Sequence, residues 1–284
     1  MPIKLWAPEQ LPPLPDLKVA VVGHVEWVQF LEVDRLPQPG LIAHALQAQE
    51  EPAGGGAVVA VQLARLLARP VRFFTALGAD AVGRASVQRL QQLGLQMEVA
   101  WRDAPSRRGI SMVDEQADRS ITVVGERLTP GAADPLPWHE LAECDAVFVT
   151  AADPAALRAC RAARILAATP RVRLTVLEQA QVRLDALIGS GLDPGEQVPD
   201  GSLSLPPLLR IATAGAEGGW ADPGGPYAAA ALEAPLRDSY GCGDSFAAGV
   251  VAGLAAAWPL DQAISLGCHC GARCASRFGP YEQD

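Results

Sequence analysis

Short runs of consecutive apolar residues alternate along the chain with segments in which apolar residues recur at helical spacing. The first run, at 19–22, lies inside a predicted strand at 17–25 and contains no polar position, as is typical of a parallel strand buried on both faces. The other predicted strands are 71–77, 146–150, 172–177, 186–188 and 208–213, and the predicted helices are 57–68, 85–93, 154–166, 244–258 and 260–278. This alternation predicts an α/β fold built on a mostly parallel sheet.

Two stretches interrupt the alternation with short runs of alternating polar and apolar residues. In the second stretch, the runs 109–113 and 119–124 flank a polar turn, and this pattern predicts an antiparallel hairpin. We expect the segments near 28–50 and 97–124 to form one small β-sheet lid. The rest of the chain is expected to be a single domain, so that one domain with its lid spans residues 1–284.

A glycine-rich turn before an apolar helix is the most informative local pattern. Gly241 and Gly243 flank Cys242 in a turn that would expose successive backbone N–H groups, and the helix that follows would direct its positive dipole end at an anion. Asp244 stands at the start of this helix, where its carboxylate could accept a proton from an attacking hydroxyl. An N-cap role would also explain Asp244, but a second aspartate, Asp238, lies upstream of the same turn and favours chemistry.

Three further places are weaker candidates. The glycine run at 54–56 opens a predicted helix and could form an anion or hydroxyl site, although no Gly-x-Gly-x-x-Gly motif is present. The stretch 213–219 could approach a nucleotide, and a plain turn explains it almost as well. After the first strand, His24 is best explained as a loop or core histidine, whereas Glu26 fits a substrate contact and a solvated turn equally.

Composition excludes several classes of function. The net charge is −9, and no run of Lys or Arg could follow a nucleic-acid backbone. The longest apolar run, 246–258, is shorter than the ~20 residues that span a bilayer, so we expect a cytoplasmic protein with no membrane partner. The cysteines are too sparse for a disulfide scaffold, and Cys268, Cys270 and Cys274 are better explained as buried small side chains than as zinc ligands.

The segment Asp-Ser-Tyr-Gly-Cys-Gly-Asp at 238–244 resembles the Asp-Thr-x-Gly-Ala-Gly-Asp signature of the ribokinase-like (PfkB) carbohydrate kinase family. Ser239 replaces Thr and Cys242 replaces Ala, and the resemblance extends over roughly 17–279. It implies a three-layer α/β/α fold with a β lid, ATP as phosphoryl donor, Mg²⁺, and a monovalent cation as a further candidate. A homodimer formed through the lid is also a candidate arrangement.

The resemblance also implies roles for individual residues. Asp244 would be the catalytic base, Gly241, Cys242 and Gly243 would form an anion hole, Thr213, Gly215, Gly218, Asp238 and Ser239 would lie on the nucleotide side, and Glu26, Gly54 and Gly55 would bind the substrate. The family's Asn-x-x-Glu motif corresponds here to 190–193, so that Asp193 would be the remaining carboxylate for the metal.

The sugar side departs from the family pattern. Where sugar-binding members carry Asn-x-Asp after the first strand, this chain ends the motif with Val28, and Val58 stands where an Asn is expected. These replacements predict a less polar pocket that favours a nucleoside or a modified sugar over free ribose or fructose. The leading hypothesis is an ATP-dependent kinase acting on a primary hydroxyl of a sugar-like small molecule. A non-catalytic ligand-binding or regulatory relative is the alternative, and an unrelated dinucleotide-binding α/β enzyme is a distant third.

Overall fold

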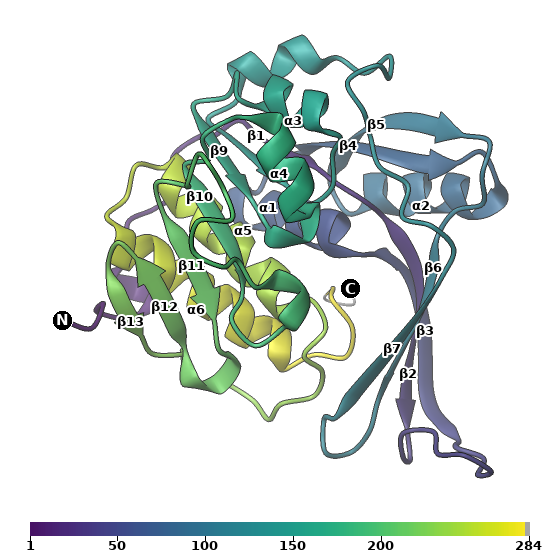
Figure 1. Cartoon of the computed structure of the whole chain (residues 1–284). Helices are drawn as coiled ribbons and strands as arrows, with labels where there is room; N and C mark the ends of the chain where they lie inside the picture. The colour runs from purple at the N-terminus through teal and green to yellow at the C-terminus, as the bar shows by residue number, and fades with distance from the viewer. Residues whose placement is uncertain (282–284) are drawn as a thin grey trace.

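The computed structural model describes residues 1–281, which form a large sheet covered by helices and a smaller sheet that projects from it (Figure 1). The helices are α1 (Gly55–Leu67), α2 (Ala81–Gln92), α3 (Pro154–Cys160), α4 (Leu174–Ala180), α5 (Cys242–Ala255) and α6 (Leu260–Ala275). The strands of the large sheet are β1 (Val19–Val22), β4 (Val71–Gly78), β5 (Leu95–Arg102), β8 (Ala146–Val149), β9 (Ile165–Ala168), β10 (Ala186–Ser190), β11 (Arg210–Thr213), β12 (Gly219–Asp222) and β13 (Gly225–Tyr227). Those of the small sheet are β2 (Glu26–Val33), β3 (Ala45–Ala53), β6 (Arg108–Val113) and β7 (Arg119–Val124).

Strand β1 shows why the fold has three layers. All four of its side chains are buried, and alternate side chains of a strand point to opposite faces of the sheet. Val19 and Val21 belong to the core cluster that includes residues of α1, α5 and α6. Ala20 and Val22 belong to a second cluster with residues of α3 and α4. The sheet is therefore covered on both faces, which confirms the predicted α/β/α arrangement.

The order of strands in the large sheet is β13-β12-β11-β10-β9-β8-β1-β4-β5. All neighbours from β11 to β5 pair in parallel, and only β12 and β13 pair antiparallel. The carboxyl ends of parallel strands meet at one edge of a sheet, where open α/β folds bind their ligands. The residues that follow β1, β10 and β11 consequently come together at this edge.

The small sheet has the order β3-β2-β6-β7 and joins the two segments that were expected to form one lid. Strands β6 and β7 form the predicted antiparallel hairpin, and β6 pairs in parallel with β2. The start of the second lid segment near residue 97 is wrong, because β5 runs beside β4 in the large sheet. The lid contribution of this segment begins at Arg108.

Two predictions between β8 and β10 are wrong. The predicted strand at 172–177 is a 3-10 turn at Pro170–Val172 followed by α4. Its alternating apolar residues imitate a strand, but the Thr169 hydroxyl accepts a hydrogen bond from the Arg171 N–H and opens a helical turn instead. The predicted helix at 154–166 ends at Cys160, because the last part of that range forms β9 and pairs with β8. Within residues 1–281, no helix is both long and apolar enough to cross a membrane.

Candidate active site

Helix α5 begins at the glycine-rich turn that the sequence singled out. Gly241, the N-cap residue, has a φ of 78°, in the left-handed region that favours glycine. No side chain caps the helix, and within residues 1–281 the N–H groups of Gly243 and Asp244 find no hydrogen-bond acceptor. The turn therefore offers free donors and the positive end of the helix dipole, as the sequence predicts.

Asp238 shapes this turn from beneath. Its side chain is 1% exposed, and its two carboxylate oxygens accept hydrogen bonds from the backbone N–H groups of Tyr240, at 2.8 Å, and Gly279, at 3.1 Å. The Cys242 thiol points toward Asp238 and donates to its backbone carbonyl oxygen at 3.9 Å. Asp238 thus ties the turn to the end of the described chain, which differs from the nucleotide contact expected of it.

The glycine run before α1 brings a second helix N-terminus to the same place. Gly54 has a φ of 84°, and its N–H donates to the Tyr240 hydroxyl at 3.1 Å. A Cβ atom on Gly55 would lie 3.0 Å from Oδ1 of Asp244, so only glycine leaves the carboxylate unobstructed. The N-termini of α1 and α5 therefore meet around Asp244.

Asp244 is the titratable group at the centre of this arrangement. Within residues 1–281 its carboxylate has no ion pair within 4.0 Å. Burial raises its pKa to about 6, against the opposing charge of Arg171. The N-terminus of α5 was expected to hold this carboxylate ionised at neutral pH, and with a pKa of about 6 it is still mostly ionised there, although burial raises the pKa.

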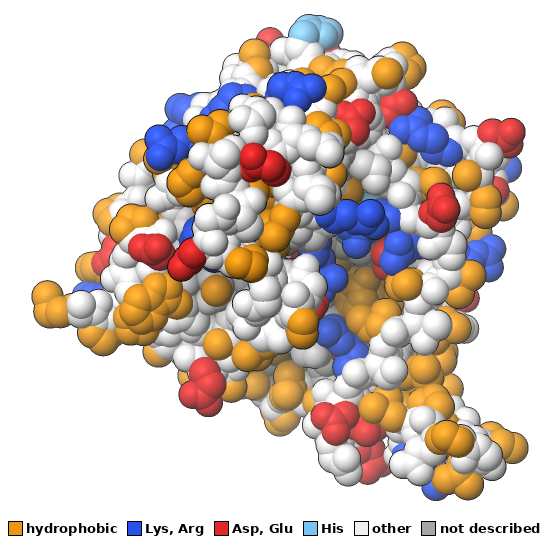
Figure 2. All heavy atoms as spheres, viewed as in Figure 1, with side chains coloured by type: hydrophobic (Ala, Val, Ile, Leu, Met, Phe, Trp, Pro, Cys, Tyr) orange, Lys and Arg blue, Asp and Glu red, His pale blue; other side chains and the backbone are white. Residues whose placement is uncertain are grey.

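A cavity of about 380 Å³ opens in front of Asp244, between the body and the lid. Basic side chains surround the hollow beside the lid strands in Figure 2. The predicted site residues that line the cavity are Glu26, Gly54, Gly55, Thr213, Ser239, Gly241, Gly243 and Asp244. The sequence therefore identified residues from four separate segments that the fold brings together.

Other predicted site residues do not line the cavity. Cys242 and Asp238 lie behind the turn, and Gly215 and Gly218 lie beyond Thr213. A Cβ atom on Gly218 would come within 2.0 Å of the Tyr227 carbonyl oxygen, so this glycine is required for close packing of the backbone. Its role in the structure does not depend on a nucleotide.

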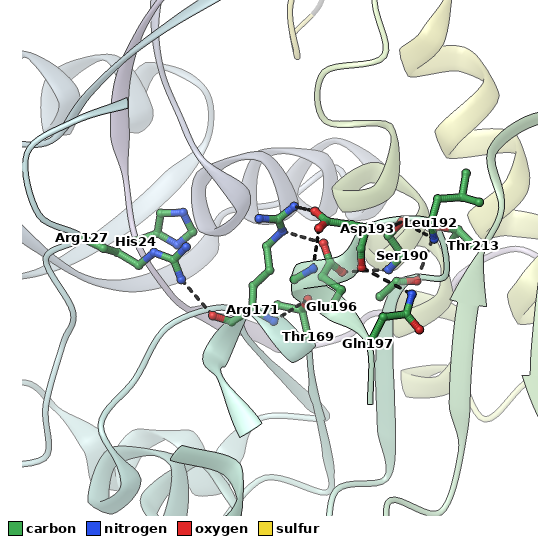
Figure 3. A network of polar contacts seen from close by, with 12 residues as sticks. His24, Arg127, Thr169, Arg171, Ser190, Leu192, Asp193, Glu196, Gln197 and Thr213 are labelled. Atoms are coloured by element: carbon green, nitrogen blue, oxygen red, sulfur yellow. Dashed lines mark hydrogen bonds and ion pairs between the residues drawn. The ribbon is translucent and has the colours of Figure 1, made fainter. Parts of the chain in front are cut away.

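Glu196, which the sequence analysis missed, lines the cavity where Asp193 was expected to act. Its Oε2 accepts a hydrogen bond from the Ser190 N–H at 2.8 Å, and its Oε1 accepts one from Arg171 Nε at 2.6 Å. Asp193 instead caps its own loop through Gly195, and it also pairs with Arg171 (Figure 3). The signal for Glu196 was a second carboxylate three residues after the one chosen.

His24 and Glu26 lie at the opposite end of the cavity. The His24 ring is buried, and burial together with nearby arginines lowers its pKa well below the usual value, which leaves it neutral at pH 7. Glu26 Oε1 lies 2.9 Å from Arg107 Nε and 3.7 Å from His24 Nε2. Both residues therefore face the ligand space, which was the less favoured interpretation for His24.

Four arginines that the sequence analysis missed also line the cavity, namely Arg107, Arg119, Arg127 and Arg171. The first three belong to the lid segment or its flanks, where basic residues recur in an acidic chain. That enrichment was the available signal, but only the fold shows that the guanidinium groups face one cavity.

The placement of Val28 and Val58 in the cavity wall is wrong. Val28 and Val58 are each 1% exposed and lie behind the cavity. Val58 packs under the α5 turn, where a Cβ atom on Gly241 would lie 3.0 Å from it, and Val28 packs under Gly109. The two valines therefore support the backbone of the site, and the cavity is lined both by charged groups and by other apolar side chains, among them Ile121, Val123, Phe148 and Ile188.

The residues present fit Mg²⁺ held largely by nucleotide phosphates and water. Mg²⁺ in nucleotide sites uses one or two carboxylates together with substrate phosphates, and Glu196 supplies one carboxylate facing the cavity. Within residues 1–281, no group of three His, Cys, Asp or Glu side chains forms a cage for a metal held by protein alone. Cys268, Cys270 and Cys274 are free cysteines with buried side chains.

Comparison with known proteins agrees with the fold. Ribokinase from Thermotoga maritima superposes with a TM-score of 0.72 at 19% identity, covering 93% of this chain and 94% of that one. Adenosine kinase from Sinorhizobium meliloti superposes with a TM-score of 0.73 at 18% identity, covering 94% and 96%. Ribokinase from Cryptococcus neoformans, solved in complex with ADP, gives a TM-score of 0.70 at 20% identity, covering 93% and 95%.

A search of curated proteins found no match. The family model for the pfkB family of carbohydrate kinases, in contrast, matches residues 16–190 and 209–283. These two ranges include both glycine-rich helix starts, the lid strands and Asp244. The chain therefore belongs to the pfkB family of carbohydrate kinases.

Proposed function

We propose that this protein is an ATP-dependent kinase that transfers the γ-phosphoryl group to a primary hydroxyl of a sugar or sugar-like small molecule. The observation that carries the proposal is the Asp244 carboxylate, which lies between the N-termini of α1 and α5 with no ion-pair partner among residues 1–281. A buried carboxylate with a pKa of about 6 that faces a cavity suits a general base. Residues 1–281 would act as one kinase domain, because body and lid line the same cavity.

The proposed reaction assigns each part of the site a step. The acceptor hydroxyl oxygen attacks the γ-phosphorus, the bond to the bridging oxygen of ADP breaks, and ADP keeps the electron pair. Asp244 orients the hydroxyl and receives its proton. The free N–H groups of Gly243 and Asp244 stabilise the negative charge on the transferred group, since a helix N-terminus favours anions. Bound Mg²⁺ would neutralise phosphate charge and position the leaving group.

The donor would occupy the side of the cavity formed by Ser190, Glu196 and Thr213. These residues follow β10 and β11, at the carboxyl edge of the sheet. Ser239 lines the cavity near the α5 turn. Glu196 is the proposed carboxylate for the metal in place of Asp193, because only Glu196 faces the cavity.

The direct test measures ADP release from ATP and Mg²⁺ with and without each of a panel of acceptors that includes sugars, sugar acids, sugar phosphates and nucleosides. We expect at least one acceptor to increase ADP release well above the acceptor-free rate. If ATP binds, as measured by calorimetry, but no acceptor increases its turnover, the non-catalytic relative replaces this proposal.

A further inference from the structure

Arg127 is a guanidinium group that forms no ion pair among residues 1–281. It lines the cavity, and its Nη1 donates to the backbone carbonyl of Arg171 at 2.9 Å. Its Nε is buried and has no hydrogen-bond partner. Within residues 1–281, no carboxylate lies within 4.0 Å of it. A partly buried charge is costly unless it is paired, so Arg127, which has intermediate burial and no ion pair among the described residues, favours an anionic ligand.

The guanidinium group of Arg107 adds a second positive charge close to Arg127. Arg107 lines the same cavity, and its side chain is 14% exposed. The largest influence of any single charge on the pKa of Arg127 comes from Arg107, and it acts in the same direction as burial, which lowers that pKa. The two positive groups are therefore close enough to repel each other in a partly buried site.

Glu26 acts on both arginines, as an ion pair of Arg107 and as a more distant charge near Arg127. Glu26 pairs with Arg107 at 2.9 Å, but the Arg107 Nε–H is not directed at it as a hydrogen bond. Burial also raises the pKa of Glu26, which makes its negatively charged form less favourable. The neutral His24 ring beside them contributes no negative charge. This end of the cavity consequently keeps an excess of positive charge.

The excess of positive charge lies away from the side of the cavity proposed to bind ATP. Figure 3 shows Arg127 beside His24 at one end of the polar network, with Ser190 and Thr213 at the other end. Between them, Arg171 is already neutralised by Asp193, at 2.5 Å, and Glu196, at 2.6 Å. The positive excess is therefore on the acceptor side, next to Glu26 and Gly54.

We propose, building on the proposed kinase function, that the acceptor is anionic and that Arg107 and Arg127 bind its phosphate or carboxylate group. Guanidinium groups present several planar donors that match the oxygens of these anions. The acceptor class is a sugar phosphate or a sugar acid that retains a free primary hydroxyl. Its anion binds beside His24, and its hydroxyl reaches Asp244.

The experiment compares matched acceptors by steady-state kinetics: fructose with fructose 6-phosphate and fructose 1-phosphate, and glucose with gluconate. The phosphate and carboxylate arms separate the two sources of charge. We expect at least one anionic member to exceed its neutral parent by about 10- to 100-fold in kcat/KM, the range of one or two hydrogen bonds to a charged group. A neutral parent with the higher kcat/KM in both series would overturn the inference while leaving the kinase proposal intact.

Variants then locate the anion. Arg127→Gln should raise the KM of the preferred anionic acceptor about 10- to 100-fold with little change in the KM for ATP. Arg173→Gln, which removes the same charge close to Arg127 but outside the cavity, is the matched control and should leave both values within about threefold. If Arg127→Gln raises mainly the KM for ATP, the arginine serves the donor and the inference fails.

Binding keeps the two proposals distinguishable if no acceptor is turned over. Calorimetric titration with fructose, fructose 6-phosphate, fructose 1-phosphate and gluconate measures recognition without chemistry. Tighter binding of an anionic compound than of fructose, lost in Arg127→Gln, would support the anion site even if the kinase proposal failed. Equal or absent binding of all four would contradict it.

Discussion

The two ends of the cavity differ in how their arginines are matched. Near β10, Arg171 has two carboxylate partners, Asp193 and Glu196. Near the lid, Glu26 pairs with Arg107, and Arg127 forms no ion pair among the described residues. The first end thus has more carboxylate than guanidinium charge, and the second has a positive excess that the proposed acceptor anion would balance. In the proposed account, acceptor specificity resides in the lid end, and Asp244 stands between the two ends.

The largest effect is expected at the centre. Asp244→Asn should lower kcat by about 10²- to 10⁴-fold, because it removes a positioned base, and nucleotide affinity should change little. Steady-state kinetics measures kcat, and calorimetric titration with ATP measures nucleotide affinity in the same preparation. A mutant that turns over its best acceptor at close to the wild-type rate would remove Asp244 from the mechanism.

The thermal stability of Asp244→Asn provides a control, because the direction in which its Tm should differ from that of the wild type can be predicted. The folded-state pKa of Asp244, about 6, is above its unfolded value, so the fold favours the protonated form and loses stability as the pH rises through about 6. Asp244→Asn should therefore have a higher Tm than the wild type above about pH 7, and a similar Tm near about pH 4. A lower Tm throughout would mean that loss of activity reflects damage to the fold.

The next effect separates the two carboxylates that pair with Arg171. Glu196→Gln should lower kcat/KM for ATP with Mg²⁺ about 10- to 100-fold, because Glu196 faces the cavity and accepts two hydrogen bonds. Asp193→Asn is the matched control and should change this value by less than about threefold, since Asp193 lies outside the cavity lining. Equal losses in both variants would return the metal role to Asp193.

The pH dependence gives an effect of intermediate size. Asp244 must be ionised to accept a proton, and its pKa is raised to about 6. The value of kcat should therefore fall about tenfold between about pH 7 and about pH 5, with the acceptor and ATP saturating. A rate that is flat over this range in the wild type would show that a group of lower pKa, or no group, controls the step.

The smallest effect tests the approach of α1 to the base. Gly55→Ala would place a Cβ atom 3.0 Å from Asp244 Oδ1, tight enough to displace the carboxylate by a few tenths of an ångström. We expect a loss of kcat of about three- to tenfold, since misplacement of a base is less damaging than its removal. Unchanged kcat would indicate that Asp244 adjusts without consequence.

The sequence predicted most of the fold because its signals were local. The apolar run of β1 required burial on both faces, and Gly241 marked the turn before α5 with a conformation that glycine favours. The strand predicted at 172–177 failed because its alternation of apolar residues also fits α4 packed against the sheet. Local pattern could not decide between the two, and tertiary packing did.

The candidate site was predicted in part for a similar reason. Glycines and Asp244 form a compact motif, whereas the arginines are scattered from 107 to 171 and meet only through the lid. Val28 and Val58 were expected to face the ligand, but a side chain's direction relative to the cavity depends on how the lid and α1 pack, which sequence spacing does not reveal. The electrostatic character of the pocket therefore emerged only from the structure.

The central claim, that the two ends of the cavity hold two different anions, is tested most directly by a crossed measurement of KM. The KM for ATP and the KM for the preferred anionic acceptor are determined in Arg127→Gln and Arg171→Gln under one set of conditions. Arg127→Gln should raise the acceptor KM by about tenfold or more and spare that for ATP, and Arg171→Gln should do the reverse by disturbing Glu196. If both variants raise the same KM, the cavity has no such division and the account is contradicted.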